Sequence, residues 1–150
     1  MSELITADLV DLELTGTDRA EVTGALARRL VEAGRVRNLD GFLADIRKRE
    51  EQMPTGIEGG IGIPHARSAH VTAPALAFGR SRAGVDFGAD DGPAHLIFLI
   101  AAPDGGGQDH LTILASLARR LMHESFRQSL LDAGDAQTVV EVIKKEVFGQ

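Results

Sequence analysis

The sequence predicts an α/β fold, a three-layer sandwich in which a mixed central sheet is flanked by helices on both faces. Leu96 to Ala101 is a continuous apolar run, as expected for a central strand that is buried on both faces. Segments before and after this run carry apolar residues at helical spacing. Strands interleaved with helices imply this layered architecture. Residues 1–150 contain no internal repeat or linker, so we expect one domain.

The first elements follow from alternation and capping. Residues 9–14 alternate apolar and acidic side chains, which predicts a half-buried strand. Thr17 and Asp18 then offer an N-cap, and Glu21 completes a capping box with Asp18. Gly34 is placed to end the helix that comes next. The apolar positions of that helix are Val22, Ala25, Leu26, Leu30 and Ala33.

A second helix and a glycine-rich segment come after it. The helix begins near Asp40, runs to about Glu51 and is stopped by Pro54. Its apolar face consists of Phe42, Leu43 and Ile46. Residues 55–64 are rich in glycine, and the isoleucines within them suggest a short strand that ends at Pro64 and His65.

The second half of the chain is mainly helical. The expected elements are strands at 76–79 and 96–101, a glycine-rich loop at 103–109, a helix after it, and helices at about 124–132 and 136–147. The helix after the loop has one apolar face, formed by Leu111, Leu114, Leu117, Ala118 and Leu121. The last helix has an apolar stripe of Val139, Val140, Ile143 and Val147.

Composition excludes several classes of function. The net charge is −6, and the basic residues form no patch or stripe, which argues against a nucleic-acid partner. The chain has no cysteine, so it holds no disulfide, no cysteine-based zinc site and no thiol nucleophile. The longest apolar run, at 96–102, is much shorter than the roughly 20 residues of a membrane-spanning helix. The N-terminus lacks the pattern of a signal peptide, so we expect a cytoplasmic protein.

Two of the five histidines stand out by position. His65 follows the expected short strand and Pro64, in a glycine-rich neighbourhood, and His110 lies where a glycine-rich loop meets a helix. Sites in α/β proteins commonly occupy such junctions. The other three histidines, which we interpret as structural or surface residues, are His70, His95 and His123.

The residues around His65 suit phosphoryl transfer. A neutral imidazole can attack phosphorus, and its ordinary pKa of about 6.5 leaves it mostly neutral at pH 7. The reaction then needs in-line positioning and donors or positive charge around the phosphoryl oxygens. Glycine-rich loops at 59–62 and 105–107 and the helix start at His110 offer backbone donors. Arg49 and Arg67 offer guanidinium groups.

Spacing alone leaves less specific interpretations open. His65 and His110 can be structural or surface histidines, Arg49 can belong to a solvated helix face, and Gly105 to Gly107 can be a flexible turn. A metal site built from both histidines and an aspartate is a further alternative, but no HxH or HExxH spacing supports it. We expect no cofactor and no resident metal.

Short motifs in this chain resemble those of a known family. They are Arg49-Glu50, Pro54-Thr55-Gly56-Ile57 and Gly62-Ile63-Pro64-His65, followed downstream by Asp109-His110-Leu111. In this order and spacing they resemble the enzyme IIA domain of the bacterial phosphotransferase system, fructose–mannitol class (type 2). The resemblance covers nearly the whole chain. Residues 60–87 look more like the fructose branch than the mannitol branch.

The resemblance implies a definite role. His65 would accept a phosphoryl group, through Nε2, from a phosphohistidine of HPr or an HPr-like domain. It would then pass the group to a cysteine of an enzyme IIB domain, for uptake of fructose or mannitol. His110 would support the phosphoryl group and Arg49 would stabilise its charge, whereas Thr55 and Gly62 would only shape the site.

The resemblance also implies limits and alternatives. The sugar would bind the membrane-embedded enzyme IIC, fused or associated, and never this domain, so membrane contact would be indirect. A regulatory enzyme IIA-like protein, which signals by its phosphorylation state, is the main alternative. A metal-dependent hydrolase that uses His65 and His110 is a third hypothesis, from another class. The exact sugar, any fusion to IIB or IIC, and the oligomeric state are left open.

Overall fold

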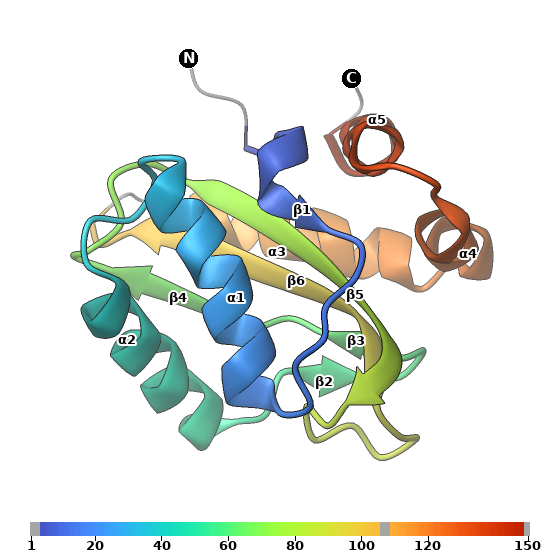
Figure 1. Ribbon diagram of the computed structural model, residues 1–150, viewed down its shortest axis with the longest axis horizontal. Coiled ribbons are helices and arrows are strands. Elements are labelled where there is room, and N and C mark those ends of the chain that lie inside the picture. The colour runs from blue at the N-terminus through green and yellow to red at the C-terminus, as the bar shows by residue number, and fades with distance from the viewer. Residues whose placement is uncertain (1–3, 106–108, 149–150) are drawn as a thin grey trace.

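The computed structural model describes residues 4–105 and 109–148, which form a three-layer α/β sandwich (Figure 1). Helices α1 (Arg19–Glu32) and α2 (Leu39–Gln52) lie on one face of the sheet. Helix α3 (Asp109–Leu121) lies on the opposite face, where α5 (Ala136–Phe148) packs against it. The short helix α4 (Glu124–Asp132) connects these two. The predicted fold class, with a mixed sheet covered on both faces, is confirmed.

The sheet contains six strands within the described residues, in the order β1-β5-β6-β3-β2, with β4 also paired to β6. The strands are β1 (Val10–Asp11), β2 (Gly56–Ile57), β3 (Ile61–Gly62), β4 (His65–Ser68), β5 (Ala75–Val85) and β6 (Ala94–Pro103). The long strands β5 and β6 are antiparallel, whereas β3 and β4 both run parallel to β6. The central strand β6 therefore positions both strands on either side of Pro64.

Capping side chains begin the first two helices. The Asp18 carboxylate accepts a hydrogen bond from the Glu21 N–H at 2.8 Å, as predicted for the N-cap of α1. The Glu21 carboxylate reaches back to Thr17 rather than to Asp18, so the capping box is shifted by one residue. Asn38 caps α2 through the Gly41 N–H. After α1, Gly34 takes a positive φ of 76°, which suits glycine and ends the helix.

Two strands differ from the prediction. The strand expected at 9–14 is reduced to β1, preceded by a short 3-10 helix, η1 (Ala7–Leu9). The Asp11 carboxylate accepts the N–H of Glu13 in a local bond, and beyond β1 the Leu14 N–H donates to the Arg80 carbonyl of β5 at 3.0 Å. Strand β5 is longer than the expected 76–79, because it continues past an irregularity between Arg80 and Val85. That continuation is polar and glycine-containing, so no alternation marks it in the sequence.

Buried apolar side chains form one cluster on each face of the sheet. Strand β6 contributes alternate residues to both, with Ile97 and Leu99 facing α1 and α2 and Phe98 and Ile100 facing α3 and α5. Phe98 also packs against Phe78 with ring centroids 5.1 Å apart. The prediction that β6 is a central strand buried on both faces is therefore confirmed.

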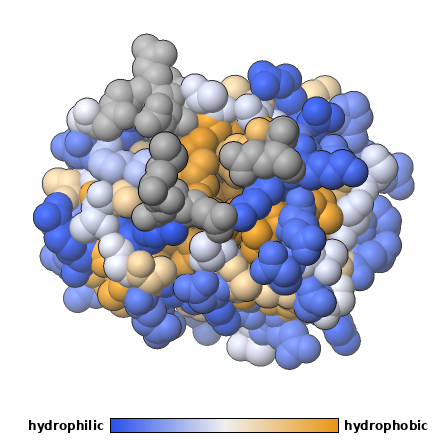
Figure 2. Space-filling view, turned by 90° about the horizontal axis from the view of Figure 1, so that it is seen from above, coloured by the Kyte–Doolittle hydropathy of each residue, from blue (hydrophilic) through white to orange (hydrophobic). Residues whose placement is uncertain are grey.

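Figure 2 shows one face of the molecule. The face in Figure 2 carries mostly hydrophilic side chains, with a hydrophobic area between the segments drawn in grey. Among the helices of residues 4–105 and 109–148, none combines the length and the apolar character that a membrane span requires.

Candidate functional site

His65 is the first residue of β4, and this differs from the predicted position after a strand end. Strand β3 ends earlier, at Gly62, and both β3 and β4 pair with β6. Pro64 lies in the break between them, because proline has no N–H to donate to a sheet. Its carbonyl still accepts the Ile100 N–H at 3.0 Å, so the segment stays in contact with β6 across the interruption.

Strand alternation directs His65 towards the face that α3 covers. His65 is paired with Ile100, which belongs to the apolar cluster shared with α3 and α5. The following residue, Ala66, belongs to the cluster on the α1–α2 face, and Ser68 donates to Asp45 of α2 at 2.6 Å. Since successive side chains in a strand point to opposite faces, the His65 ring lies on the α3 side.

His110 is the second residue of α3, as predicted for a histidine at the start of that helix. Its side chain, with those of Asp109 and Leu111, lies outside the described residues. The backbone nevertheless brings the helix that carries His110 to the same face of the sheet as His65. Gly106 and Gly107 of the adjacent predicted loop also lie outside the described part.

The His65 ring is held by a hydrogen bond to the backbone. Its Nδ1 lies 2.8 Å from the carbonyl oxygen of Ile63. A carbonyl oxygen only accepts, so Nδ1 must carry the proton. In a neutral imidazole the other nitrogen, Nε2, then keeps its lone pair. The half-buried ring is thus held as the tautomer in which Nε2 is the nucleophile.

The environment also lowers the pKa of His65 below its ordinary value of 6.5. Burial has the largest effect, because it disfavours the charged ring, and the positive charge of Arg49 acts in the same direction. The hydrogen bond to Ile63 and the negative charge of Glu50 oppose this shift. His65 is therefore neutral, and nucleophilic, at pH 7.

Arg49 lies at the C-terminal end of α2, close enough to His65 to influence its pKa. One of its Nη atoms donates to the carbonyl oxygen of Met53 at 3.3 Å. Within the described residues its guanidinium forms no ion pair with a carboxylate. Arg49 is therefore a half-buried cation beside His65 that has donors to offer an incoming anion.

Beside Arg49, a buried carboxylate fixes the segment before β2. Glu50 accepts hydrogen bonds from the backbone N–H of Thr55 at 2.9 Å and from its hydroxyl at 2.7 Å. Arg19 of α1 forms an ion pair with the same carboxylate at 3.1 Å. Sequence reasoning assigned no role to Glu50. It follows Ile46 by four residues and Phe42 by eight, and this helical spacing is the signal that places it on the buried stripe of α2.

Thr55 continues this set of contacts towards the histidine. Its carbonyl oxygen accepts the N–H of Ile63 at 3.1 Å, and Ile63 in turn holds the His65 ring. Packing requires a glycine at position 62. A Cβ at Gly62 would lie 2.7 Å from the Phe87 ring. The shaping roles expected for Thr55 and Gly62 therefore have a specific structural basis.

Two other predicted contributors are the glycine-rich loop at 59–62 and Arg67. Gly59 and Gly60 form the turn between β2 and β3, and the Gly59 N–H donates to Asp91 at 3.0 Å, so this donor is engaged by a carboxylate. Arg67 is exposed on β4, two residues after His65 and on the same face of the strand.

The remaining histidines agree with structural or surface roles. The ring of His95 is 2.9 Å from the carbonyl oxygen of Ser81, and it is half-buried between strands. His70 packs against Gly41, where a Cβ would lie 2.4 Å from its Nε2. His123 is exposed directly before α4.

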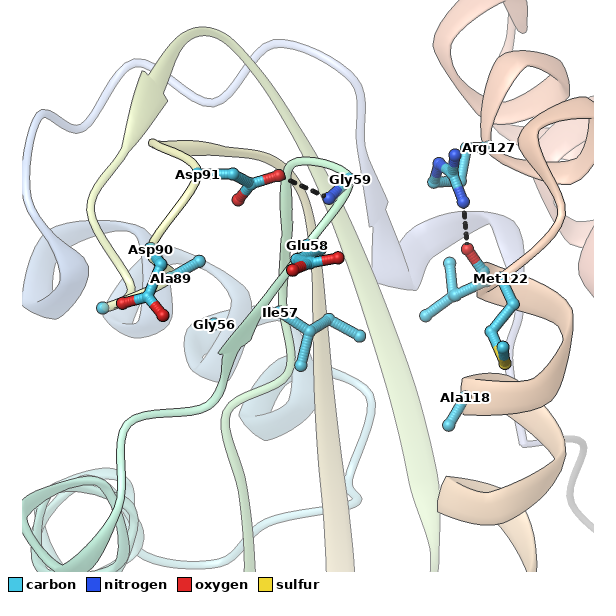
Figure 3. A pocket seen from close by; sticks show the side chains of 12 residues that line it. Gly56, Ile57, Glu58, Gly59, Ala89, Asp90, Asp91, Ala118, Met122 and Arg127 are labelled. Atoms are coloured by element: carbon cyan, nitrogen blue, oxygen red, sulfur yellow. Dashed lines mark hydrogen bonds between the residues drawn. The ribbon is translucent and has the colours of Figure 1, made fainter.

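Two hollows lie near the site without being lined by His65. The larger, about 730 Å³, separates the β2–β3 turn from the end of α3. Figure 3 shows its acidic side, Glu58, Asp90 and Asp91, across from Ala118 of α3 and Met122, which directly follows that helix. The smaller, about 320 Å³, lies between α1 and α2 and includes Pro64 and Glu50.

No group of three histidine, aspartate or glutamate side chains that could hold a metal ion is present in the part of the chain that the structure describes. The predicted alternative of a metal site built from His65 and His110 involves the His110 side chain, which lies outside the described residues. The chemistry carried by the described residues is therefore that of a neutral imidazole beside a guanidinium.

Comparisons with known proteins match this chain to one family. Residues 3–146 match the family model described as "Phosphoenolpyruvate-dependent sugar phosphotransferase system, EIIA 2". The chain is 43% identical over 148 residues to the fructose-specific EIIA component of Haloferax volcanii, covering 98% of this chain and 96% of that protein. It is 38% identical to the fructose-specific EIIABC component of Bacillus subtilis, covering 97% of this chain and 23% of that longer polypeptide.

Solved structures agree with the fold. The nitrogen regulatory protein IIA-Ntr of Neisseria meningitidis has a TM-score of 0.86 and 28% identity, with 93% of this chain and 96% of that chain covered. Enzyme IIA mannitol of Escherichia coli, in its complex with phosphorylated enzyme IIB mannitol, has a TM-score of 0.80 at 23% identity, with 97% and 98% covered. The chain belongs to the type 2 enzyme IIA family of the phosphoenolpyruvate-dependent sugar phosphotransferase system.

Proposed function

We propose that His65 is the phosphoryl acceptor of this phosphocarrier, and that Nε2 is the atom that forms the bond to phosphorus. The observation that carries the proposal is the hydrogen bond from Nδ1 to Ile63, which leaves the Nε2 lone pair available beside Arg49. A lowered pKa keeps the ring neutral at the pH where it must attack.

The transfer proceeds in two steps of the same kind. In the first, the Nε2–P bond forms as the N–P bond of the donor phosphohistidine breaks, and the donor ring leaves with the electron pair of that bond. In the second, an acceptor thiolate forms an S–P bond as the Nε2–P bond breaks, which returns His65 to its neutral form. No oxidant, cofactor or water is consumed in either step.

Arg49 stabilises the negative charge of the phosphoryl oxygens during both steps. A guanidinium is always protonated and presents several donors in a plane, which suits the equatorial oxygens of a transferring phosphoryl group. His110, in the first turn of α3, is the proposed second support of the same group. Arg49 and His110 thus position charge and hydrogen-bond donors, whereas the bond to phosphorus forms at His65.

The partners follow from the chemistry. Family members transfer phosphate to enzyme IIB, and we propose an HPr or HPr-like phosphohistidine as the donor. We propose fructose as the sugar of the pathway, given the fructose-specific relatives, and a membrane-embedded enzyme IIC, not this domain, as the protein that binds it. We place the relay in the cytoplasm and propose residues 1–150 as its single IIA domain.

Exposed apolar side chains near the site suit protein docking. Met53, which follows α2, is 63% exposed, and Ile57, in β2, is 38% exposed. They flank Thr55 in sequence, on the segment that Glu50 anchors. Exposed methionine and isoleucine next to an arginine form the kind of surface that is enriched at protein interfaces. A macromolecular phosphoryl donor would need such a surface, whereas a small-molecule donor would not.

A regulatory role is the second candidate, because the chain is similar to the nitrogen regulatory protein of Neisseria meningitidis at 28% identity. The fructose-specific relative, at 43%, favours transport. In both roles His65 accepts the phosphoryl group. The roles differ in whether the group is then passed to an enzyme IIB.

The test is a two-stage transfer assay. The protein is incubated with labelled phosphoenolpyruvate, enzyme I and HPr, and an enzyme IIB with a reactive cysteine is then added. We expect acid-labile label on this protein that moves to enzyme IIB, no label on His65→Gln, and wild-type labelling of the exposed control His123→Gln. Label that enters but never reaches any enzyme IIB would favour regulation. An absence of label on the wild type would refute the proposed function.

A further inference from the structure

Glu50 is the one carboxylate among the described residues that is both buried and joined to the His65 segment. It is 7% exposed, and a charge so deeply buried requires partners. Thr55 supplies two of them, through its N–H at 2.9 Å and its hydroxyl at 2.7 Å, and Arg19 supplies a third at 3.1 Å. Both carboxylate oxygens are therefore engaged, and the carboxylate is held in one orientation.

Backbone hydrogen bonds extend from this carboxylate to the His65 ring. The Thr55 carbonyl accepts the Ile63 N–H at 3.1 Å, and the Ile63 carbonyl lies 2.8 Å from His65 Nδ1. Ile63 precedes Pro64, in the interruption between β3 and β4. The bond from Thr55 continues the antiparallel register of β2 and β3 by one residue, so the position of the Ile63 carbonyl depends on Thr55.

Arg19 supports the carboxylate from the α1 side. Besides the ion pair, its Nε donates to the carbonyl oxygen of Asp86 at 3.2 Å, and its guanidinium lies 5.6 Å from the centre of the Phe87 ring. Arg19 is thereby fixed to the segment after β5 as well as to Glu50. The carboxylate consequently joins α1, the end of α2 and the segment before β2 at one point.

We infer that Glu50 is a positioning residue for phosphoryl transfer: its carboxylate fixes Thr55, and through Thr55 the Ile63 carbonyl that holds the His65 ring with Nε2 unprotonated. The inference rests on the proposed role of His65 and adds the group that keeps this nucleophile in its reactive tautomer. Glu50 does not touch the phosphoryl group. It acts through two backbone segments.

Two conservative variants separate its geometry from its charge. In Glu50→Gln the amide can still accept the Thr55 N–H and donate to the Thr55 hydroxyl, so the geometry is kept and the charge is lost. In Glu50→Asp the charge is kept, but the side chain is one methylene too short to reach both Thr55 donors. Glu50→Ala removes both, and the exposed neighbour Glu51→Ala is the matched control.

The first measurement is the tautomer of His65, taken from the nitrogen-15 shifts of its ring in the full chain. We expect the wild type, Glu50→Gln and Glu51→Ala to show Nδ1 protonated and Nε2 unprotonated. We expect Glu50→Asp and Glu50→Ala to show a mixture of both tautomers. In addition, the titration midpoint of His65 falls in Glu50→Gln, because the charge that raises the pKa of His65 has been removed.

The second measurement is the rate of phosphoryl transfer from HPr. Displacement of the nucleophile lowers the transfer rate on the order of 10–100-fold. We expect such a loss for Glu50→Ala and a smaller one for Glu50→Asp. Glu50→Gln should retain a rate within about threefold of the wild type, since it keeps the geometry. A merely structural role would lower the folded fraction without changing the tautomer of the molecules that remain folded.

Wild-type tautomer and wild-type rate in both Glu50→Asp and Glu50→Ala would overturn the inference. If Glu50→Ala does not fold, Glu50→Asp decides the geometric claim and the midpoint of Glu50→Gln decides whether the carboxylate acts on His65. The failure of the proposed function looks different. The wild type would then accept no phosphoryl group, while the tautomer comparison would still report whether Glu50 orients the ring.

Discussion

On the α1–α2 face of the sheet, buried polar side chains hold backbone segments in place, whereas on the α3–α5 face the contacts are mainly apolar. The first face contains Arg19, Glu50 and Thr55, and the bond from Ser68 to Asp45. The second contains the aromatic pair Phe78 and Phe98 and the apolar stripes of α3 and α5.

The difference shows how the fold divides its tasks. Polar contacts are directional, so they can hold a ring and a carbonyl within the narrow limits that transfer requires. Apolar packing is less directional and serves to keep the sheet and helices together. Variants of the polar contacts on the α1–α2 side should therefore change transfer more than stability, and variants of the apolar cluster on the α3–α5 face should do the reverse.

The largest effect on stability is expected from Ile143→Ala in α5. Ile143 is fully buried in the cluster on the α3–α5 face, and its truncation should lower the free energy of unfolding by about 2–5 kcal/mol. Denaturant unfolding measures this loss, with the exposed Gln137→Ala as control. Transfer per folded molecule should stay at the wild-type level. A changed His65 tautomer in this variant would contradict the proposed division between the faces.

Arg49→Gln should produce the largest effect on transfer without loss of the nucleophile. Removal of a charged donor from the site should slow transfer by about 10²–10³-fold, with little change in stability. The pKa of His65 should rise at the same time, because the Arg49 charge lowers it. Stopped-flow transfer and histidine titration measure both quantities. Arg47→Gln, exposed on the same helix, is the control, and an equal loss in both variants would refute a specific role for Arg49.

Arg80→Met tests a polar contact of the α3–α5 side. An Nη of Arg80 lies 2.7–3.1 Å from the carbonyl oxygens of Leu130, Leu131 and Ala133, at the end of α4. Its loss should lower stability by about 1.5–3 kcal/mol, because charged hydrogen bonds to a helix end are removed. Thermal unfolding compared with the exposed Arg82→Met measures the effect. Slower transfer per folded molecule would mean that the two faces are coupled.

The smallest expected effect is on pH dependence. The pKa of His65 in the folded chain is below its unfolded value of 6.5. Between these two pKa values the unfolded chain binds more protons than the folded chain. His65 therefore makes stability fall as the pH decreases through 6.5, and this part of the slope should be missing in His65→Gln. Acceptance of phosphate should stay constant down to pH 6.5 and fall only below it. The measurement is the free energy of unfolding between pH 5 and 7.5. The same slope against pH in the wild type and in His65→Gln would contradict this prediction.

Helices were more predictable from the sequence than strands. The expected helix at 124–132 has the bounds of α4, and the one at 136–147 nearly those of α5, because capping and periodicity are local. The strand β2 has only two residues and exists because it pairs with β3, and β5 continues through the polar residues after Arg80. Such strands are determined by their neighbours in the sheet and leave little local signal.

The site was predictable in part. The positions of His65 and Arg49 follow from motif spacing, and the structure couples the two electrostatically. Three other features depend on backbone geometry, which residue spacing does not predict. They are the start of β4 at His65, the hydrogen bond of His65 to Ile63, and the contacts of Glu50 with Thr55. The contribution of His110 stays a prediction, since its side chain lies outside the described residues.

The central claim is that Nε2 of His65 carries the phosphoryl group, and the most direct measurement is phosphorus–nitrogen coupling in phosphorylated protein labelled with nitrogen-15 at histidine. We predict a coupling between phosphorus and Nε2 of a single histidine, which disappears together with the label in His65→Ala. A coupling to Nδ1 of His65, or to any ring nitrogen of another histidine, would contradict it.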